Sequence, residues 1–311
     1  MFAATAVVIG LLAVPPQGAA QPAGDSRPQL GTTETDKTVD AARGTRLTLD
    51  NQAGEVIVRT WDRDAVRVQA RHSTREQVNV SVSEGQVRIR TGRNGRWGAA
   101  GSIDYELTVP AWMPVRLSGT YMFATLEGVQ GEVAAETVQG DVTVRGGSGQ
   151  ITARSVEGFV TVNDAKGRIE ARSVDGNVTI AGCTGDIVAD TTDGDIRITG
   201  SAAMSIDAST IDGDIIFDGT VNNEGQYRMV THDGDVYMRV PEGTSATVSI
   251  RTYEGRFTLS YPVQLSGDYK RGRRVSFTLG GGAAAVEIEA FDGHIRILKP
   301  SDPLPEPGAK R

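Results

Sequence analysis

"VEGFVTVNDAKGRIEARSVDGNVTIAGCTGDIVADTTDGDIRI", residues 156–198, places a glycine at every ninth position. The spacing extends upstream, and the glycines that share it lie at positions 131, 140, 149, 158, 167, 176, 185 and 194. An aliphatic residue lies two positions after each of these glycines. The residue four positions after each glycine alternates between alanine and a larger aliphatic side chain. The repeating unit therefore has 18 residues and consists of two unlike halves.

This repeat predicts short strands separated by tight corners. Apolar residues two apart mark a strand with one buried face, and a glycine at fixed spacing suits a turn. Each nine-residue half then forms one strand and one corner, and successive coils stack their strands in parallel about 4.8 Å apart. The expected fold is all-β, a parallel β-solenoid (β-helix) whose narrow interior sets large aliphatic side chains against alanines.

Small side chains at the corners fit the same architecture. A hydroxyl residue recurs at every second corner with inward parity, and we expect these hydroxyls to bond backbone groups at the bend. They are Thr137, Ser155, Ser173, Thr191, Thr210, Thr231 and Thr252. The lone cysteine, Cys183, occupies a slot otherwise filled by valine, alanine or glycine, so we expect a small buried side chain. One cysteine also excludes an intramolecular disulfide and a cysteine-based zinc or iron–sulfur site.

The N-terminus has the features of an export signal. An apolar run of about 12 residues, Ala3 to Val14, precedes two prolines and a small-residue cluster, and it is too short to span a bilayer. We expect residues 1–20 to be a signal peptide, residues 21–42 to be a flexible leader, and the mature chain to lack a transmembrane segment. Residues 43–118 are strand-rich without the nine-residue spacing and predict a cap or small domain built on an antiparallel or mixed sheet.

Beyond residue 200 the repeat loosens but persists. Residues 119–298 are expected to form the solenoid, with an insertion at 264–282 that carries the basic sequence KRGRR, residues 270–274. Since terminal coils need a cap that differs from the repeat, we expect this insertion to close the C-terminal end. The proline-rich tail, residues 299–311, is expected to be disordered.

Several sequence stretches carry a resemblance to a known family. They are GEVIVRTWDRDAVRVQA (54–70), YELTVPAWMPVRL (105–117), and the units GDVTV, GNVTI and GDIRI. With the signal-like start, the chain resembles a bacterial "putative adhesin" family of unknown function with β-strand repeats. More distantly, it is similar to the head domains of auto-transporter adhesins. The resemblance covers residues 43–298 and implies an exported, non-enzymatic binding scaffold, and it supplies no catalytic residue.

Carboxylates gather at one kind of corner. They are Asp193, Asp195, Asp212, Asp214, Asp233 and Asp235, with Asp175 and Asp292 in related slots. If the coils stack in register these groups line one edge, where a cation such as Ca²⁺ would relieve their repulsion. The calcium-binding G-G-x-G-x-D pattern is absent, however, and Asp-Gly is good turn chemistry by itself. We therefore expect no cofactor and keep these residues as candidates for cation binding.

The histidines offer a second kind of chemistry. His232 and His294 lie near Asp233 and Asp292, with several aromatic residues in the neighbourhood. A polysaccharide lyase or glycosidase on a β-helix would use such carboxylates with a basic residue and an aromatic platform, which makes a carbohydrate-active enzyme the alternative function. Otherwise His232, in the slot of Val174 and Ile211, is a partly buried side chain and His294 faces solvent.

Arginines concentrate in the N-terminal region. Five of them form a possible face for an anionic ligand: Arg59, Arg67, Arg71, Arg88 and Arg90. The net charge of −7 and the export signal argue against nucleic acid as the partner. The sequence thus predicts an exported scaffold or adhesin-like protein of the cell envelope, in the periplasm, at the cell surface or outside the cell, which binds a glycan or an envelope protein.

Overall fold

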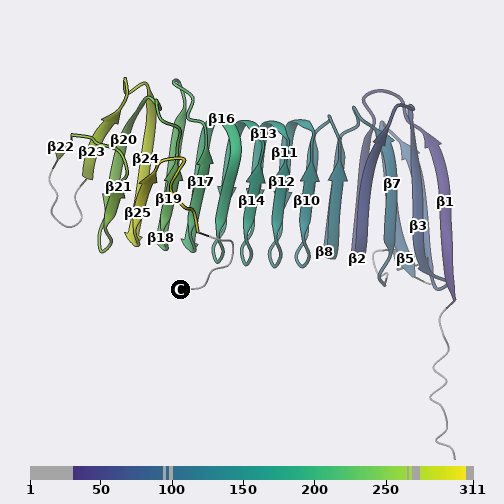
Figure 1. Cartoon of the computed structure of the whole chain (residues 1–311). Helices are drawn as coiled ribbons and strands as arrows, with labels where there is room; N and C mark the ends of the chain where they lie inside the picture. The colour runs from purple at the N-terminus through teal and green to yellow at the C-terminus, as the bar shows by residue number, and fades with distance from the viewer. Residues whose placement is uncertain (1–30, 94–95, 98–100, 265, 268–273, 306–311) are drawn as a thin grey trace, which may run out of the picture. The chain divides into compact units, whose positions relative to one another are not determined.

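The computed structural model describes residues 31–93, 96–97, 101–264, 266–267 and 274–305, and every regular element in them is a β-strand. The regular coils occupy the middle of the chain (Figure 1). Their strands are β8 (Val115–Glu127), β9 (Val133–Glu136), β10 (Val142–Arg145), β11 (Ser148–Arg154), β12 (Val160–Asn163), β13 (Lys166–Arg172), β14 (Val178–Ala181), β15 (Thr184–Asp190) and β16 (Ile196–Asp212).

The strands of these coils form two facing layers, and all of their pairings are parallel. Layer I contains β9, β11, β13 and β15, layer II contains β10, β12 and β14, and the long strands β8 and β16 pass through both. Val142 pairs with Val160, which pairs with Val178, a register of 18 residues. The predicted parallel β-solenoid with 18-residue coils of two halves is therefore confirmed.

The interior is as narrow as the alternating repeat predicts. Ala153 and Ala171 of layer I and Val160 and Val178 of layer II are fully buried. Small residues also line the second corner, where Cys183 is buried, as predicted, between Ala165 and Ser201 in the neighbouring coils. The core is thus a ladder of branched side chains closed at its edges by small ones.

The hydroxyl residues at the first corner bond backbone groups, also as predicted. The Ser173 hydroxyl donates to the carbonyl oxygen of Gly158 in the preceding coil at 2.9 Å, and Thr191 donates to Gly176 at 2.9 Å. Ser155, Thr210 and Thr231 repeat this contact. Each hydroxyl thereby satisfies a carbonyl group that the bend leaves outside the strand ladder.

At the C-terminal end the order of coils in space departs from their order in the chain. The strands here are β17 (Ile215–Gly219), β18 (Gln226–Asp233), β19 (Val236–Arg239), β20 (Ala246–Thr252), β21 (Phe257–Leu259), β22 (Ser266–Gly267), β23 (Arg274–Leu279), β24 (Ala284–Asp292) and β25 (Ile295–Leu298). The last coil, β24 with β25, lies between the β18–β19 coil and the β20–β21 coil (Figure 1). β23 then pairs antiparallel with β20, which covers that end of layer I.

The N-terminal end shows the same departure. Its strands are β1 (Thr32–Asp40), β2 (Arg46–Trp61), β3 (Ala65–Ser73), β4 (Glu76–Ser83), β5 (Gln86–Arg93), β6 (Arg96–Trp97) and β7 (Asp104–Pro110). β2 passes through both layers and lies between β8 on one side and β5 with β7 on the other, always in parallel. β3 and β4 add antiparallel edges. The sheet is therefore mixed, and its parallel part continues the solenoid.

Both flanking segments hold more structure than their composition predicts. β1 lies inside the segment expected to be a leader, and it pairs antiparallel with β3 because TTETDKTVD alternates in register with that strand. Residues 299–305, expected to be disordered, lie against layer II, where Arg197 donates to the carbonyl of Pro305 at 3.0 Å and Arg239 donates to that of Asp302 at 3.1 Å. The signal peptide, residues 21–30, residues 268–273 and residues 306–311 lie outside the described residues.

Candidate binding surface

Each coil turns at its first corner through five residues with fixed roles. In the coil of Ser173 they are an inward hydroxyl (Ser173), an exposed apolar residue (Val174), an exposed carboxylate (Asp175), a glycine and Asn177. Because the coils stack in register, each role becomes a column along the solenoid. We call this edge the acidic corner, with an apolar column and a carboxylate column at its surface.

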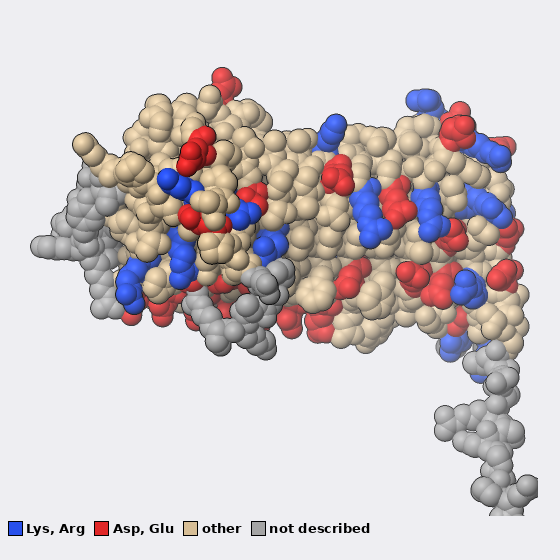
Figure 2. Space-filling view, in the orientation of Figure 1, with Lys and Arg blue, Asp and Glu red and all other residues tan. Residues whose placement is uncertain are grey.

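The carboxylate column is continuous over seven coils. In spatial order it contains Glu157, Asp175, Asp193, Asp212, Asp233, Asp292 and Glu254, all of them exposed. Successive coils lie about 4.8 Å apart, so the column carries one negative charge per coil. In the described part of the chain, no ion pair involves any of the five aspartates of this column. Figure 2 shows acidic atoms along the lower edge of the molecule.

The apolar column runs beside the carboxylates. In spatial order it is Val138, Val156, Val174, Thr192, Ile211, His232, Phe291 and Tyr253. Ten large hydrophobic side chains are exposed in the described part of the chain, and eight of them lie on the acidic corner. These are Tyr121, Phe123, Val138, Val156, Phe159, Val174, Ile211 and Phe291. Scattered exposed apolar residues are ordinary on a protein surface, but a concentration on one edge marks an interaction site.

Aromatic rings stack at the C-terminal end of the apolar column. The rings of His232 and Phe291 lie 4.7 Å apart at 9°, and those of Phe291 and Tyr253 lie 5.1 Å apart at 30°. Each ring comes from a different coil, so the stack follows the axis of the solenoid. Since the rings cover one another's faces, Phe291 offers mainly ring edges to a ligand.

The predicted cation-binding aspartates divide between two columns. Asp193, Asp212 and Asp233 belong to the exposed carboxylate column. Asp195 and Asp214, which follow the glycine, accept hydrogen bonds from the next coil: Asp195 from the Asp214 amide at 2.9 Å and Asp214 from the Asp235 amide at 2.7 Å. These two residues therefore stabilise the turn. The described residues contain no group of three ligands arranged to hold a metal ion.

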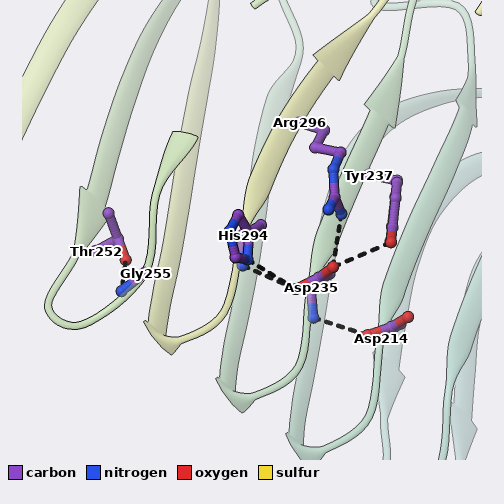
Figure 3. Close-up of polar contacts among 7 residues, drawn as sticks. All are labelled: Asp214, Asp235, Tyr237, Thr252, Gly255, His294 and Arg296. Atoms are coloured by element: carbon purple, nitrogen blue, oxygen red, sulfur yellow. Dashed lines mark hydrogen bonds and ion pairs between the residues drawn. The ribbon is translucent and has the colours of Figure 1, made fainter. Parts of the chain in front are cut away.

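Asp235 differs from the other members of its column because its side chain is 1% exposed. One carboxylate oxygen accepts the His294 amide at 2.8 Å, and the other accepts Arg296 at 2.6 Å and the Tyr237 hydroxyl at 3.0 Å (Figure 3). Burial, and secondarily the charge of Asp235, raise the pKa of Tyr237. The carboxylate is thus fully engaged in joining the inserted β25 to β19.

The structure separates the two histidines. His232 is exposed in the apolar column, and so are Val174 and Ile211, at 47% and 57% exposure, so the expectation of a partly buried slot is wrong. His294 lies beside Asp235, its Nδ1 3.8 Å from the carboxylate. The sequence therefore missed the grouping of Asp235 with Tyr237 and Arg296, for which the only signal was their position in the same pair of slots one coil apart.

The five arginines of the predicted anionic-ligand face are also divided. Arg59, Arg67 and Arg71 lie on β2, β3 and layer II, whereas Arg88 and Arg90 lie on β5 in layer I. Arg59 pairs with Glu106 and Glu127, and Arg67 donates to Asp36 at 2.6 Å. The arginines thus do not form one face, and two of them are already neutralised by carboxylates.

A shallow groove follows the acidic corner on its layer I side. Its lining includes Ser155, Val156, Ser173, Val174 and a row of paired charges formed by Glu136, Arg154, Arg172 and Asp190. Arg154 donates to Glu170, and this contact is the main reason that the pKa of Glu170 is lowered. The groove therefore has an apolar rim and a balanced, ion-paired wall.

A family model matches residues 44–298, most of the chain. The chain belongs to the Toastrack DUF4097 family. This confirms the resemblance drawn from the β-strand repeats. No curated protein matches the chain significantly, and among the described residues no helix has the length and apolarity needed to cross a membrane.

Solved structures of the same general kind come from gut and soil bacteria. A "putative adhesin" from Bacteroides fragilis is 11% identical with a TM-score of 0.44, and the match covers 86% of this chain and 97% of that one. A "putative cell adhesion protein" from Clostridium sporogenes is 13% identical with a TM-score of 0.25, covering 86% and 100%. A "putative lipid binding protein" from Parabacteroides distasonis is 8% identical with a TM-score of 0.30, covering 85% and 96%. Similarities of this size carry no argument about function.

Proposed function

We propose that this protein is an exported, non-enzymatic β-solenoid scaffold of the cell envelope that binds its partner along the acidic corner, in the manner of an adhesin. The observation that carries the proposal is the concentration of eight of the ten exposed large hydrophobic side chains on that one edge. Repetition over many coils supports many weak contacts with an elongated partner, such as a glycan or an envelope protein.

The only buried carboxylate cluster near the predicted histidines in the described residues supports a structural role. Asp235 is buried and its oxygens already accept three hydrogen bonds, so it offers a substrate neither access nor an available lone pair. The signal-like apolar run supports export, and recovery of the protein from the periplasm or medium without its first 20 residues would test that part.

Binding of the full chain to whole bacterial cells and to an array of glycans tests the proposal, with the same wells assayed for released sugar. We expect binding without release. The variant Val174→Ser/Ile211→Ser/Phe291→Ser should weaken binding at least about tenfold, because each exposed apolar contact contributes about 0.5–1 kcal/mol. The matched control Val82→Ser/Met204→Ser removes the two exposed hydrophobic residues outside the corner and should bind normally. Sugar release, or equal binding by all variants, would overturn the proposal.

A further inference from the structure

We propose that the acidic corner is the docking site for a basic amphipathic helix of a partner protein. Its apolar ridge packs on the apolar column and its lysine or arginine side chains reach the carboxylate column. This inference rests on the proposed binding function and specifies the chemistry of the partner.

Charge favours a cationic partner. The carboxylate column places a negative charge in each of seven successive coils, and its aspartates have no cationic partner among the described residues. Elsewhere on the solenoid, arginines and carboxylates neutralise one another, as Arg172 does with Asp190 and Arg228 with Asp207. A row of like charges about 4.8 Å apart repels itself, and an approaching row of positive charges relieves that repulsion.

The apolar column favours an amphipathic partner over a simple polycation. Val174 is 47% exposed and Ile211 is 57% exposed, immediately beside the carboxylates. Lysine and arginine place their aliphatic stems along apolar surface while the charged head reaches outward. The two columns together therefore match a surface on which apolar side chains are flanked by basic ones.

Dimensions favour a helix. The apolar column spans eight coils, or about 34 Å, which corresponds to a helix of about 22 residues at 1.5 Å per residue. The helical pitch of about 5.4 Å is close to the coil spacing of about 4.8 Å, so successive turns of the helix meet successive coils. In an extended strand, side chains on one face lie about 6.7 Å apart and fall out of step within two or three coils.

The corner disfavours two other modes of binding. A partner strand cannot add to this edge, because the corner amides already bond across coils, for example Asp193 to Val174 at 2.8 Å and Gly194 to Asp212 at 2.9 Å. A sugar ring stacks on the face of an aromatic ring, whereas His232, Phe291 and Tyr253 cover each other's faces.

The test uses the full chain and a fluorescent 22-residue peptide of leucine and lysine, with leucines at helical spacing. Anisotropy should show binding that weakens with salt and helix formation on binding. Asp193→Asn/Asp212→Asn/Asp233→Asn should weaken it about tenfold and flatten the salt dependence, because three charge contacts of about 0.5 kcal/mol each are removed. The control Asp141→Asn/Asp186→Asn removes charge away from the carboxylate column and should have little effect.

Two further peptides make the outcome decisive. A scrambled peptide of the same composition should bind at least about tenfold more weakly, and a leucine–glutamate peptide should not bind. Equal binding by the scrambled peptide would reduce the site to nonspecific charge attraction and overturn the helix assignment. If no peptide binds while cells or glycans still bind in a manner that depends on Ile211 and Phe291, this inference fails and the proposed function stands. If neither cells, glycans nor peptides bind at the corner, both fail.

Discussion

The middle of the solenoid and its two ends are built from the same coils but are specified in different ways. From β9 to β15 each coil packs on its neighbours in the chain, and equivalent residues such as Val142 and Val160 are interchangeable. At both ends a coil is inserted between two others: β2 between β8 and β7, and β24–β25 between β18–β19 and β20–β21. Repetition therefore sets the register, whereas individual side chains must set the order of coils.

One such side chain is Asp235 on the inserted C-terminal coil's neighbour. In the observed order it meets Arg296 of β25 at 2.6 Å. Thr258 of β21 occupies the slot equivalent to Arg296, and a threonine in that place could not neutralise the buried carboxylate. The pair thus distinguishes the observed order of coils from the order of the chain, a use of buried charge known as specification of register.

The largest expected effect concerns a regular coil. Gly167 has a φ of 113°, and a Cβ there would clash with the backbone of Gly149 in the preceding coil. Gly167→Ala should lower the free energy of unfolding by about 4 kcal/mol, the sum of strain and overpacking. Gly44→Ala is the control, since its φ is 89° but a Cβ meets no atom within 4 Å. Urea unfolding measures both, and equal losses would mean that close stacking of the coils is not the cause.

The next effect compares equivalent acids in an end coil and a regular coil. Asp235→Asn should destabilise by about 3 kcal/mol, because it leaves Arg296 without its counter-charge in a mostly buried site. Asp195→Asn should cost less than about 0.5 kcal/mol, because the acceptor oxygen remains and Asn177 already fills the same role toward Asp195 at 2.8 Å. Urea unfolding of both variants measures the difference. Similar losses would show that Asp235 acts only as a turn residue.

The smallest effect is a pH dependence in the regular coils. Arg154 lowers the pKa of Glu170 below its usual 4.5, so the folded protein binds this proton less tightly than the unfolded chain. The resulting stabilisation is present above the unfolded pKa and is lost as the pH falls through the lower folded pKa. Glu170→Gln should therefore flatten the fall in unfolding midpoint below about pH 4.5 by less than about 1 kcal/mol. A variant as acid-sensitive as the parent would remove Glu170 from the explanation.

The sequence predicts what repetition encodes. The glycine spacing determines coil length, strand register and the hydroxyl contacts of Ser173 and Thr191, because each depends only on residues 18 apart. The insertion of β24–β25 is not predictable in this way, since FDGHIRI and YEGRFTL are equivalent corner sequences and only Arg296 against Thr258 separates them.

The surface was harder to predict than the core. Recurring Val174 and Ile211 suggest a buried slot by composition, but the bend turns them outward after the inward hydroxyl. Arg59 and Arg88 suggest one basic face, but β2 crosses from layer I to layer II and thereby separates their neighbours. Both errors arise because a corner changes the parity of side chains, which strand alternation alone does not reveal.

The inserted last coil also has a consequence for the time course of folding. The β18–β19 coil cannot meet its final neighbour until β24 and β25, near the end of the chain, have been synthesised. If β20–β21 stacks on it first, that premature contact must open again before the last coil can enter. Completion of the C-terminal end is therefore coupled to completion of the chain, so a polypeptide truncated before residue 284 would lack the strands that join its last two coils and would be exposed to proteolysis there.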